Sequence, residues 1–109
     1  MEIIRNHEGA YYTPAGHDAS VRSRSIYKDG IDVHVTTFPP RSGMEEEVHE
    51  DKSHVFYVLQ GSMDVLQHGK LLGTLEADDA VVIPAGELHE ISNNSDHDVV
   101  FLAITFKQE

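Results

Sequence analysis

The chain has 109 residues and a formal net charge of −11, because 19 acidic side chains oppose 8 basic ones. This length predicts one domain spanning residues 1–109, and the negative charge disfavours nucleic acids and anionic membranes, whose phosphates would be repelled. The absence of cysteine excludes disulfides and thiolate ligands, and the lack of a long apolar run predicts a cytoplasmic protein without a signal peptide or membrane span.

Short β-strands are predicted along most of the chain, and no window of helical length shows a sustained helical pattern of apolar residues. Near the N-terminus, Tyr11-Tyr12 and residues 21–27 are possible strands on either side of a turn at Pro14-Ala15-Gly16. The clearer strands are residues 31–38, 55–59, 62–66, 71–75, 80–83 and 99–106, separated by turn signals at 39–40, 61, 67–70, 84–86 and 93–96. Such a succession of short strands and turns is typical of a β-sandwich or barrel.

The chain contains eight histidines, and histidine is the commonest metal ligand in proteins. Two segments place histidines where a strand or a turn would orient them. His49 and Asp51 are two residues apart, so they share one face of an extended strand, and His54 starts the next strand after a short polar bend. His89 follows the Pro84-Ala85-Gly86 turn, which redirects the chain.

These two segments resemble the two sequence motifs of the cupin family. The first cupin motif is glycine, five residues, His-x-His, a short spacer, glutamate, six residues and glycine. The second is glycine, five residues, Pro-x-Gly, two residues, histidine, three residues and asparagine. The resemblance covers about residues 30–106, with Gly43, His49 and Gly61 on positions of the first motif and Pro84, Gly86, His89 and Asn93 on positions of the second.

The resemblance implies an all-β, jelly-roll β-barrel (a double-stranded β-helix), with additional strands in residues 1–29. It also implies one divalent transition metal ion held by His49, Asp51, His54 and His89. Asp51 stands at the family's second histidine and His54 at its glutamate, so three nitrogens and one oxygen are kept. The spacer between Asp51 and His54 is one or two residues shorter than in the family.

This donor set suits iron, manganese, nickel, zinc or copper better than calcium or magnesium, which prefer oxygen ligands. Asp51 is either a direct ligand or a hydrogen-bond acceptor that orients one of the histidines. The acidic run Glu45–Glu47 is interpreted as a solvated loop near the mouth of the barrel.

The other histidines have less distinctive surroundings. His34 lies on the alternating strand 31–38, where it either points into the cavity as an acid/base group or faces solvent, opposite Val33 and Val35. We expect the solvent-facing orientation. Four histidines in terminal or turn-like segments are expected to be exposed: His7, His17, His68 and His97.

Two functions are consistent with these residues, because a fold does not determine its chemistry. One is a metal-dependent enzyme of the dioxygenase, isomerase or lyase type that acts on a small polar organic molecule. The other is a non-catalytic module that binds or senses a small ligand or a metal. The sequence names no substrate.

Assembly is predicted from the apolar residues of segments 55–59 and 99–104, which occupy both faces of their strands. Only one face can line the barrel, so the other requires a cover. We expect a homodimer that buries about 1,500 Å² or more, with Tyr57 or its strand neighbours in the interface.

Overall fold

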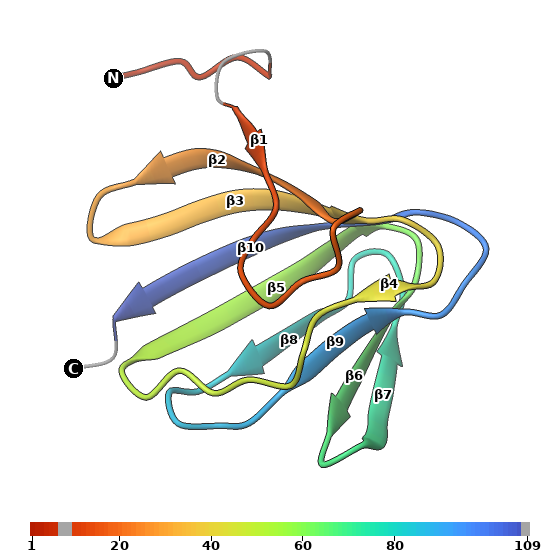
Figure 1. The fold of residues 1–109 in the computed structure, drawn as a ribbon. Coiled ribbons are helices and arrows are strands. Elements are labelled where there is room, and N and C mark those ends of the chain that lie inside the picture. Colours follow the sequence, from red (N-terminus) through yellow and green to blue (C-terminus); the bar gives the residue numbers. More distant parts are fainter. Residues whose placement is uncertain (7–9, 108–109) are drawn as a thin grey trace.

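The computed structural model describes residues 1–6 and 10–107. In this part of the chain, every regular secondary-structure element is a β-strand. Within these residues, no helix is long and apolar enough to cross a membrane. The strands, shown in Figure 1, are β1 (Tyr11–Tyr12), β2 (Arg22–Lys28), β3 (Ile31–Phe38), β4 (Ser42–Gly43), β5 (Lys52–Gln60), β6 (Met63–Gln67), β7 (Lys70–Leu75), β8 (Ala80–Ile83), β9 (Glu90–Asn93) and β10 (Val99–Lys107).

The strands form two antiparallel sheets, which face each other as the two walls of a jelly roll (Figure 1). The larger sheet has the strand order β1-β2-β3-β10-β5-β8, and the smaller one has the order β4-β9-β6-β7. From β3 to β6, consecutive strands alternate between the sheets: β3 and β5 lie in the larger sheet, and β4 and β6 lie in the smaller one. The all-β jelly-roll prediction is thereby confirmed.

The core fills one end of the space between the sheets. The inward-facing side chains of β5 run from His54 through Phe56 to Val58, and all three are buried. Phe101 of β10 packs edge-on against Phe38 and at a tilt against Phe56, with ring centroids 5.3 Å apart in both pairs. The barrel is therefore apolar at the Val58 end and carries polar side chains at the His54 end.

The predicted strands 31–38 and 80–83 have the bounds of β3 and β8. Strand β9 was not predicted, because Glu90-Ile91-Ser92-Asn93 has a single apolar residue and lies next to a strong turn signal. Gly61 lies in the expected tight connection between two strands, β5 and β6. The first of these strands belongs to the larger antiparallel sheet and the second to the smaller one. The Gly61 φ of 87° is in the left-handed region that glycine tolerates.

The N-terminal segment covers the polar end of the barrel. Strand β1 pairs with β2, and the loop that follows passes across the inner side of the larger sheet (Figure 1). Two of the contacts of this loop are with the residues that directly follow β4: a β-bridge joins His17 to Met44, and the Glu45 amide donates a 2.7 Å hydrogen bond to the Gly16 carbonyl. The segment thus becomes part of the wall around the polar space.

Candidate metal centre

Three backbone segments bring His49, His54 and His89 together. His54 lies on β5, where it pairs with Ile83 of β8 on one side and with Thr105 of β10 on the other. The Glu87 amide donates to the Pro84 carbonyl at 3.2 Å, which closes a tight turn with Gly86 at a φ of 82°. The Gly86 amide donates to the His49 carbonyl at 2.8 Å, so this turn is attached directly to the His49 segment.

Glu47 is placed beside His89 by a short antiparallel pairing. The Glu47 amide donates to the His89 carbonyl and the His89 amide donates to the Glu47 carbonyl, both at 2.9 Å. Residues that exchange both hydrogen bonds in this way are directly opposite each other, and their side chains point to the same face. Because His49 is two residues beyond Glu47, its side chain lies on that face as well.

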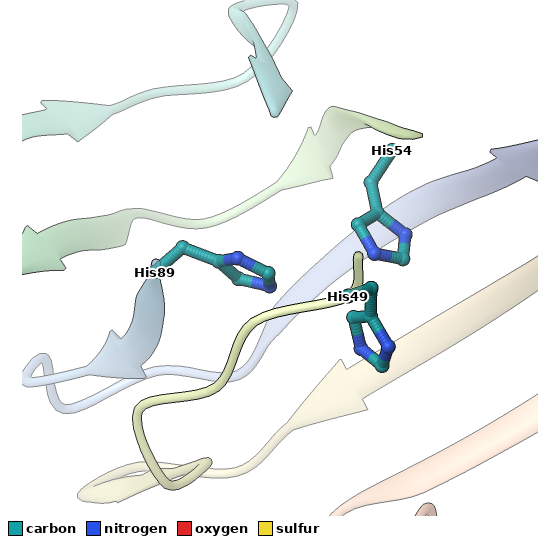
Figure 2. A group of neighbouring side chains, drawn as sticks. All are labelled: His49, His54 and His89. Atoms are coloured by element: carbon teal, nitrogen blue, oxygen red, sulfur yellow. The ribbon is translucent and has the colours of Figure 1, made fainter. Parts of the chain in front are cut away.

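The three imidazoles converge on one space, as Figure 2 shows. One ligand nitrogen from each of His49, His54 and His89 lies within 4.8 Å of the other two. The ring centroids are 4.9 Å apart for His49 and His54 and 5.5 Å apart for His54 and His89. Nitrogens bound to one ion at about 2.1 Å are at most about 4.2 Å apart, so small side-chain rotations would suffice for shared ligation.

Hydrogen bonds fix the ring nitrogens that face away from this space. The Nδ1 of His89 donates to the Glu87 carbonyl at 3.0 Å, which leaves the lone pair of a neutral ring on Nε2. The Nδ1 of His54 is 2.9 Å from the Thr105 hydroxyl oxygen. The Nε2 of His54 is buried and has no hydrogen-bond partner among the described residues. A buried nitrogen without a partner is costly, and a metal ion would satisfy it.

The carboxylate of Glu47 faces two of the histidines. Its Oε1 lies 3.0 Å from the Nε2 of His49 and 3.7 Å from the Nε2 of His89. Burial alone would raise the pKa of Glu47, but hydrogen bonds to both histidines and their positive charges outweigh it and lower that pKa to about 2. The side chain is therefore an ionised oxygen donor at neutral pH.

The histidines respond differently to these surroundings. Burial, together with the charges of His49 and His89, lowers the pKa of His54 to about 4. Burial would also lower the pKa of His89, but its hydrogen bond to Glu47 and the neighbouring acidic groups raise it overall. His54 is consequently neutral at pH 7, as a metal ligand must be. Three imidazoles and one carboxylate fit a divalent transition metal ion.

Asp51 is not brought to this group. Its side chain is exposed, and the chain bends at Glu50 and Asp51 before β5 begins. The carboxylate beside the histidines belongs instead to Glu47, which was expected to lie in a solvated loop. Of the four predicted ligands, the structure therefore brings together His49, His54 and His89.

The short spacer of the first motif is the signal that could have identified Glu47 in the sequence. When the motif is moved by two residues, Glu47 and His49 take the His-x-His positions and four residues separate His49 from His54. Arg41 then takes the position of the first glycine, and its φ of 61° is in the left-handed region, whereas Gly43 is not among the residues with positive φ. Asp78, at the corresponding glycine of the second motif, has a φ of 74°.

A cavity of about 280 Å³ adjoins the group, and Glu47, His49 and His54 form part of its wall. His34 also lines this cavity, so the expectation that it faces solvent is wrong. The expectation of an exposed His17 is wrong too: it is half-buried in the cavity wall, with its ring 5.7 Å from that of Phe38. His68 and His97 are exposed, as expected, and His7 lies outside the described residues.

Comparison with known proteins identifies the family. Residues 34–105, more than half of the chain, match the family model of the cupin domain. The chain is a cupin. No curated protein matches it in sequence.

Solved cupin structures share its fold. A structure described as a predicted oxalate decarboxylase from Thermotoga maritima has 22% identity and a TM-score of 0.86, covering 98% of this chain and 100% of that one. The polyketide cyclase RemF from Streptomyces resistomycificus has 20% identity and a TM-score of 0.84, and the match covers 100% of this chain and 80% of RemF. The cupin domain of an XRE family transcriptional regulator from Enterobacter cloacae has 19% identity and a TM-score of 0.73, and the match covers 83% of this chain and 99% of that domain.

Proposed function

We propose that this cupin binds one divalent transition metal ion through His49, His54, His89 and Glu47. The observations that carry the proposal are the convergence of one nitrogen from each of three histidines within 4.8 Å and the buried, unpartnered Nε2 of His54. Glu47 adds the oxygen donor that the sequence analysis assigned to Asp51, so the donor set of three nitrogens and one oxygen is kept.

We further propose that the centre is that of a metal-dependent enzyme acting on a small polar organic molecule. The cavity of about 280 Å³ supports this function, because a ligand in it would lie beside Glu47, His49 and His54. A bound ion supplies Lewis-acid or oxygen-activating chemistry there, as a dioxygenase, an isomerase or a lyase requires. Phe56, Phe101 and Met44 form apolar parts of the wall and exclude water from the ligand.

The alternative function is a non-catalytic module that binds or senses a small ligand or a metal. Its support is the similarity to a cupin domain of a transcriptional regulator. The similarities to proteins described as a decarboxylase and a cyclase support the enzyme in the same measure. The cavity next to the metal ligands argues against a purely structural ion, which needs no adjoining space. A module that binds a small ligand would use the same cavity, so turnover is what separates the two functions.

Turnover with and without metal tests the enzymatic proposal. The metal-free protein would be loaded separately with Fe²⁺, Mn²⁺, Ni²⁺, Zn²⁺ and Cu²⁺. Each form would be screened against small hydroxy and keto compounds for oxygen uptake and for product formation. We expect turnover that depends on one of the metals and is lost in His54→Ala. Metal-loaded protein that binds compounds from the panel reversibly and converts none of them would support the binding module instead.

A further inference from the structure

His34 and Asp32 form a pair of titratable side chains at the polar end of the barrel. They lie two residues apart on β3 and share one face, with the Nδ1 of His34 3.5 Å from the Oδ1 of Asp32. Both atoms are inaccessible to solvent, and neither has a hydrogen-bond partner among the described residues. The side chains of His34 and Asp32 are 17% and 29% exposed, respectively. The contact between them is therefore an electrostatic one at 3.5 Å, close enough to become a hydrogen bond after a small side-chain rotation.

The position of Nδ1 determines which edge of the His34 ring faces the cavity. Nδ1 is buried against Asp32, whereas the ring forms part of the cavity wall and its Nε2 is not among the buried atoms without a partner, which leaves the Nε2 edge available to a ligand. The cross-strand neighbours of His34 are Ser25 on β2 and Ala103 on β10, two small residues that leave room for the ring. An imidazole with a carboxylate beside its Nδ1 and an accessible Nε2 is suited to accept a proton on Nε2.

Charged groups from several elements surround His34. Burial lowers its pKa, and Asp32 partly opposes this effect. His17 from the N-terminal loop and Lys28 from β2 add to the lowering, and His34 also interacts electrostatically with His54 of β5. His34 is thus a neutral base at pH 7, with an adjacent carboxylate that would stabilise its protonated form.

The composition of the cavity wall indicates the protonation state in which a ligand enters. Among the described residues that line the cavity, none is a lysine or an arginine, whereas Glu47 contributes a negative charge. Apart from the proposed metal ion, a ligand that arrives as an anion would find no cation of permanent charge in this wall, and Glu47 offsets one of the two positive charges of that ion. A neutral molecule with an acidic hydroxyl group can enter without a side-chain cation and lose its proton after it has entered.

We propose that His34, positioned by Asp32, is the proton acceptor for a small neutral ligand with a weakly acidic hydroxyl group, such as a phenol or an enol. The ligand's O–H bond breaks, the proton moves to Nε2 of His34, and the electron pair stays on the ligand oxygen beside the proposed metal ligands. Asp32 offsets the positive charge of the imidazolium. This assignment rests on the proposed function, because it is the metal centre that would receive the oxygen.

The pairing of Asp32 with His34 can be tested without any metal. The imidazole protons of His34 would be followed by NMR through a pH titration of the metal-free protein and of Asp32→Asn. We expect the pKa of His34 to be lower in Asp32→Asn, because the carboxylate that favours the imidazolium is gone. An unchanged His34 pKa would overturn the positioning role of Asp32.

Proton transfer to His34 can be measured through the protons released when a ligand binds. Zinc-loaded protein would be titrated calorimetrically with 4-nitrophenol, at a pH where the free phenol is protonated, in two buffers of different ionisation enthalpy. We expect almost no proton release for the wild-type protein and for His97→Gln, whose changed residue is exposed. His34→Gln would release about one proton per bound phenol or would bind it at least tenfold more weakly at the same zinc content.

Equal proton release and equal affinity in wild type and His34→Gln would contradict the proposal, and so would zinc-loaded wild-type protein that does not bind the phenol. A protein that fails to take up zinc would instead refute the proposed function. In that case the NMR titration still decides whether Asp32 and His34 act as a pair.

Discussion

At the scale of single residues, alternation along the strand left two choices for the carboxylate. Glu47 and Asp51 are each two residues from His49, so on an extended strand either would share its face. The bend at residues 50–51 turns Asp51 outward, and the pairing with His89 turns Glu47 inward. Both features depend on contacts with distant segments, and they are therefore difficult to predict from the local sequence.

His34 illustrates a second limit of binary patterning. Placing the apolar residues Val33 and Val35 toward the core puts His34 outside, but in the structure His34 lines the cavity and Thr36 on the same face is buried. The interior of this barrel is polar near the histidines, so the usual rule of apolar inside and polar outside fails there. His89 was predictable because its spacing relative to Pro84 and Gly86 is specific.

A matched pair of substitutions distinguishes the two carboxylates. We expect Glu47→Gln to weaken metal binding by about 10–100-fold, because it removes the charge beside two of the ligands. Asp51→Asn should leave the affinity within about twofold of wild type, since Asp51 is exposed and lies outside the group. Competition titration with a chromogenic chelator measures both values. The reverse order of effects would restore Asp51 as the ligand.

At the scale of elements, the strands and their turns were largely predictable from the sequence. Pro39-Pro40, Gly61 and the Pro84–Gly86 turn interrupt the apolar runs, and the strands end close to them. Asn93 stabilises one such junction, since its side-chain amide donates to the carbonyls of Phe38, Pro39 and His97. The distribution of strands between two sheets was implied only by the resemblance to cupins, because turn residues alone do not specify which strands pair.

Two glycines with positive φ allow a test at this scale. A Cβ on Gly61 would lie 2.3 Å from the Asp98 carbonyl oxygen, whereas a Cβ on Gly86 would have Glu50 Oε2 at 3.7 Å as its nearest neighbour. We expect Gly86→Ala to lower the free energy of unfolding by about 1 kcal/mol through backbone strain alone. Gly61→Ala should cost clearly more, because a backbone clash is added. Urea denaturation compares them, and equal losses would rule out the steric difference.

At the scale of the whole molecule, the outer face of the larger sheet has exposed apolar side chains. Tyr57 and Leu59 on β5 and Val82 on the edge strand β8 are 37%, 48% and 65% exposed. Val82 pairs with the part of β5 that holds Val55, which is on the face of Tyr57. The N-terminal segment covers the inner side of the barrel end and does not account for this outer patch.

We expect a second copy of the chain to cover this patch in a homodimer. Sedimentation equilibrium at micromolar concentration should show a dimer for wild type and a 12.2 kDa monomer for Val82→Glu. Leu71→Glu, on β7 of the other sheet, serves as the control for an exposed apolar residue outside the patch. A wild-type monomer, or dissociation by Leu71→Glu alone, would show that this face is not the interface.

We expect the three converging histidines to hold one metal ion in the purified protein. The most direct test of this expectation is the metal content of protein purified without an affinity tag, measured by inductively coupled plasma mass spectrometry on wild type and on His54→Ala. We predict about one divalent transition metal ion per chain in the wild type and its loss in His54→Ala, which keeps only two of the three imidazoles. Wild-type protein that contains no such ion, and takes up none of Fe²⁺, Mn²⁺, Ni²⁺, Zn²⁺ or Cu²⁺ on dialysis, would contradict this expectation.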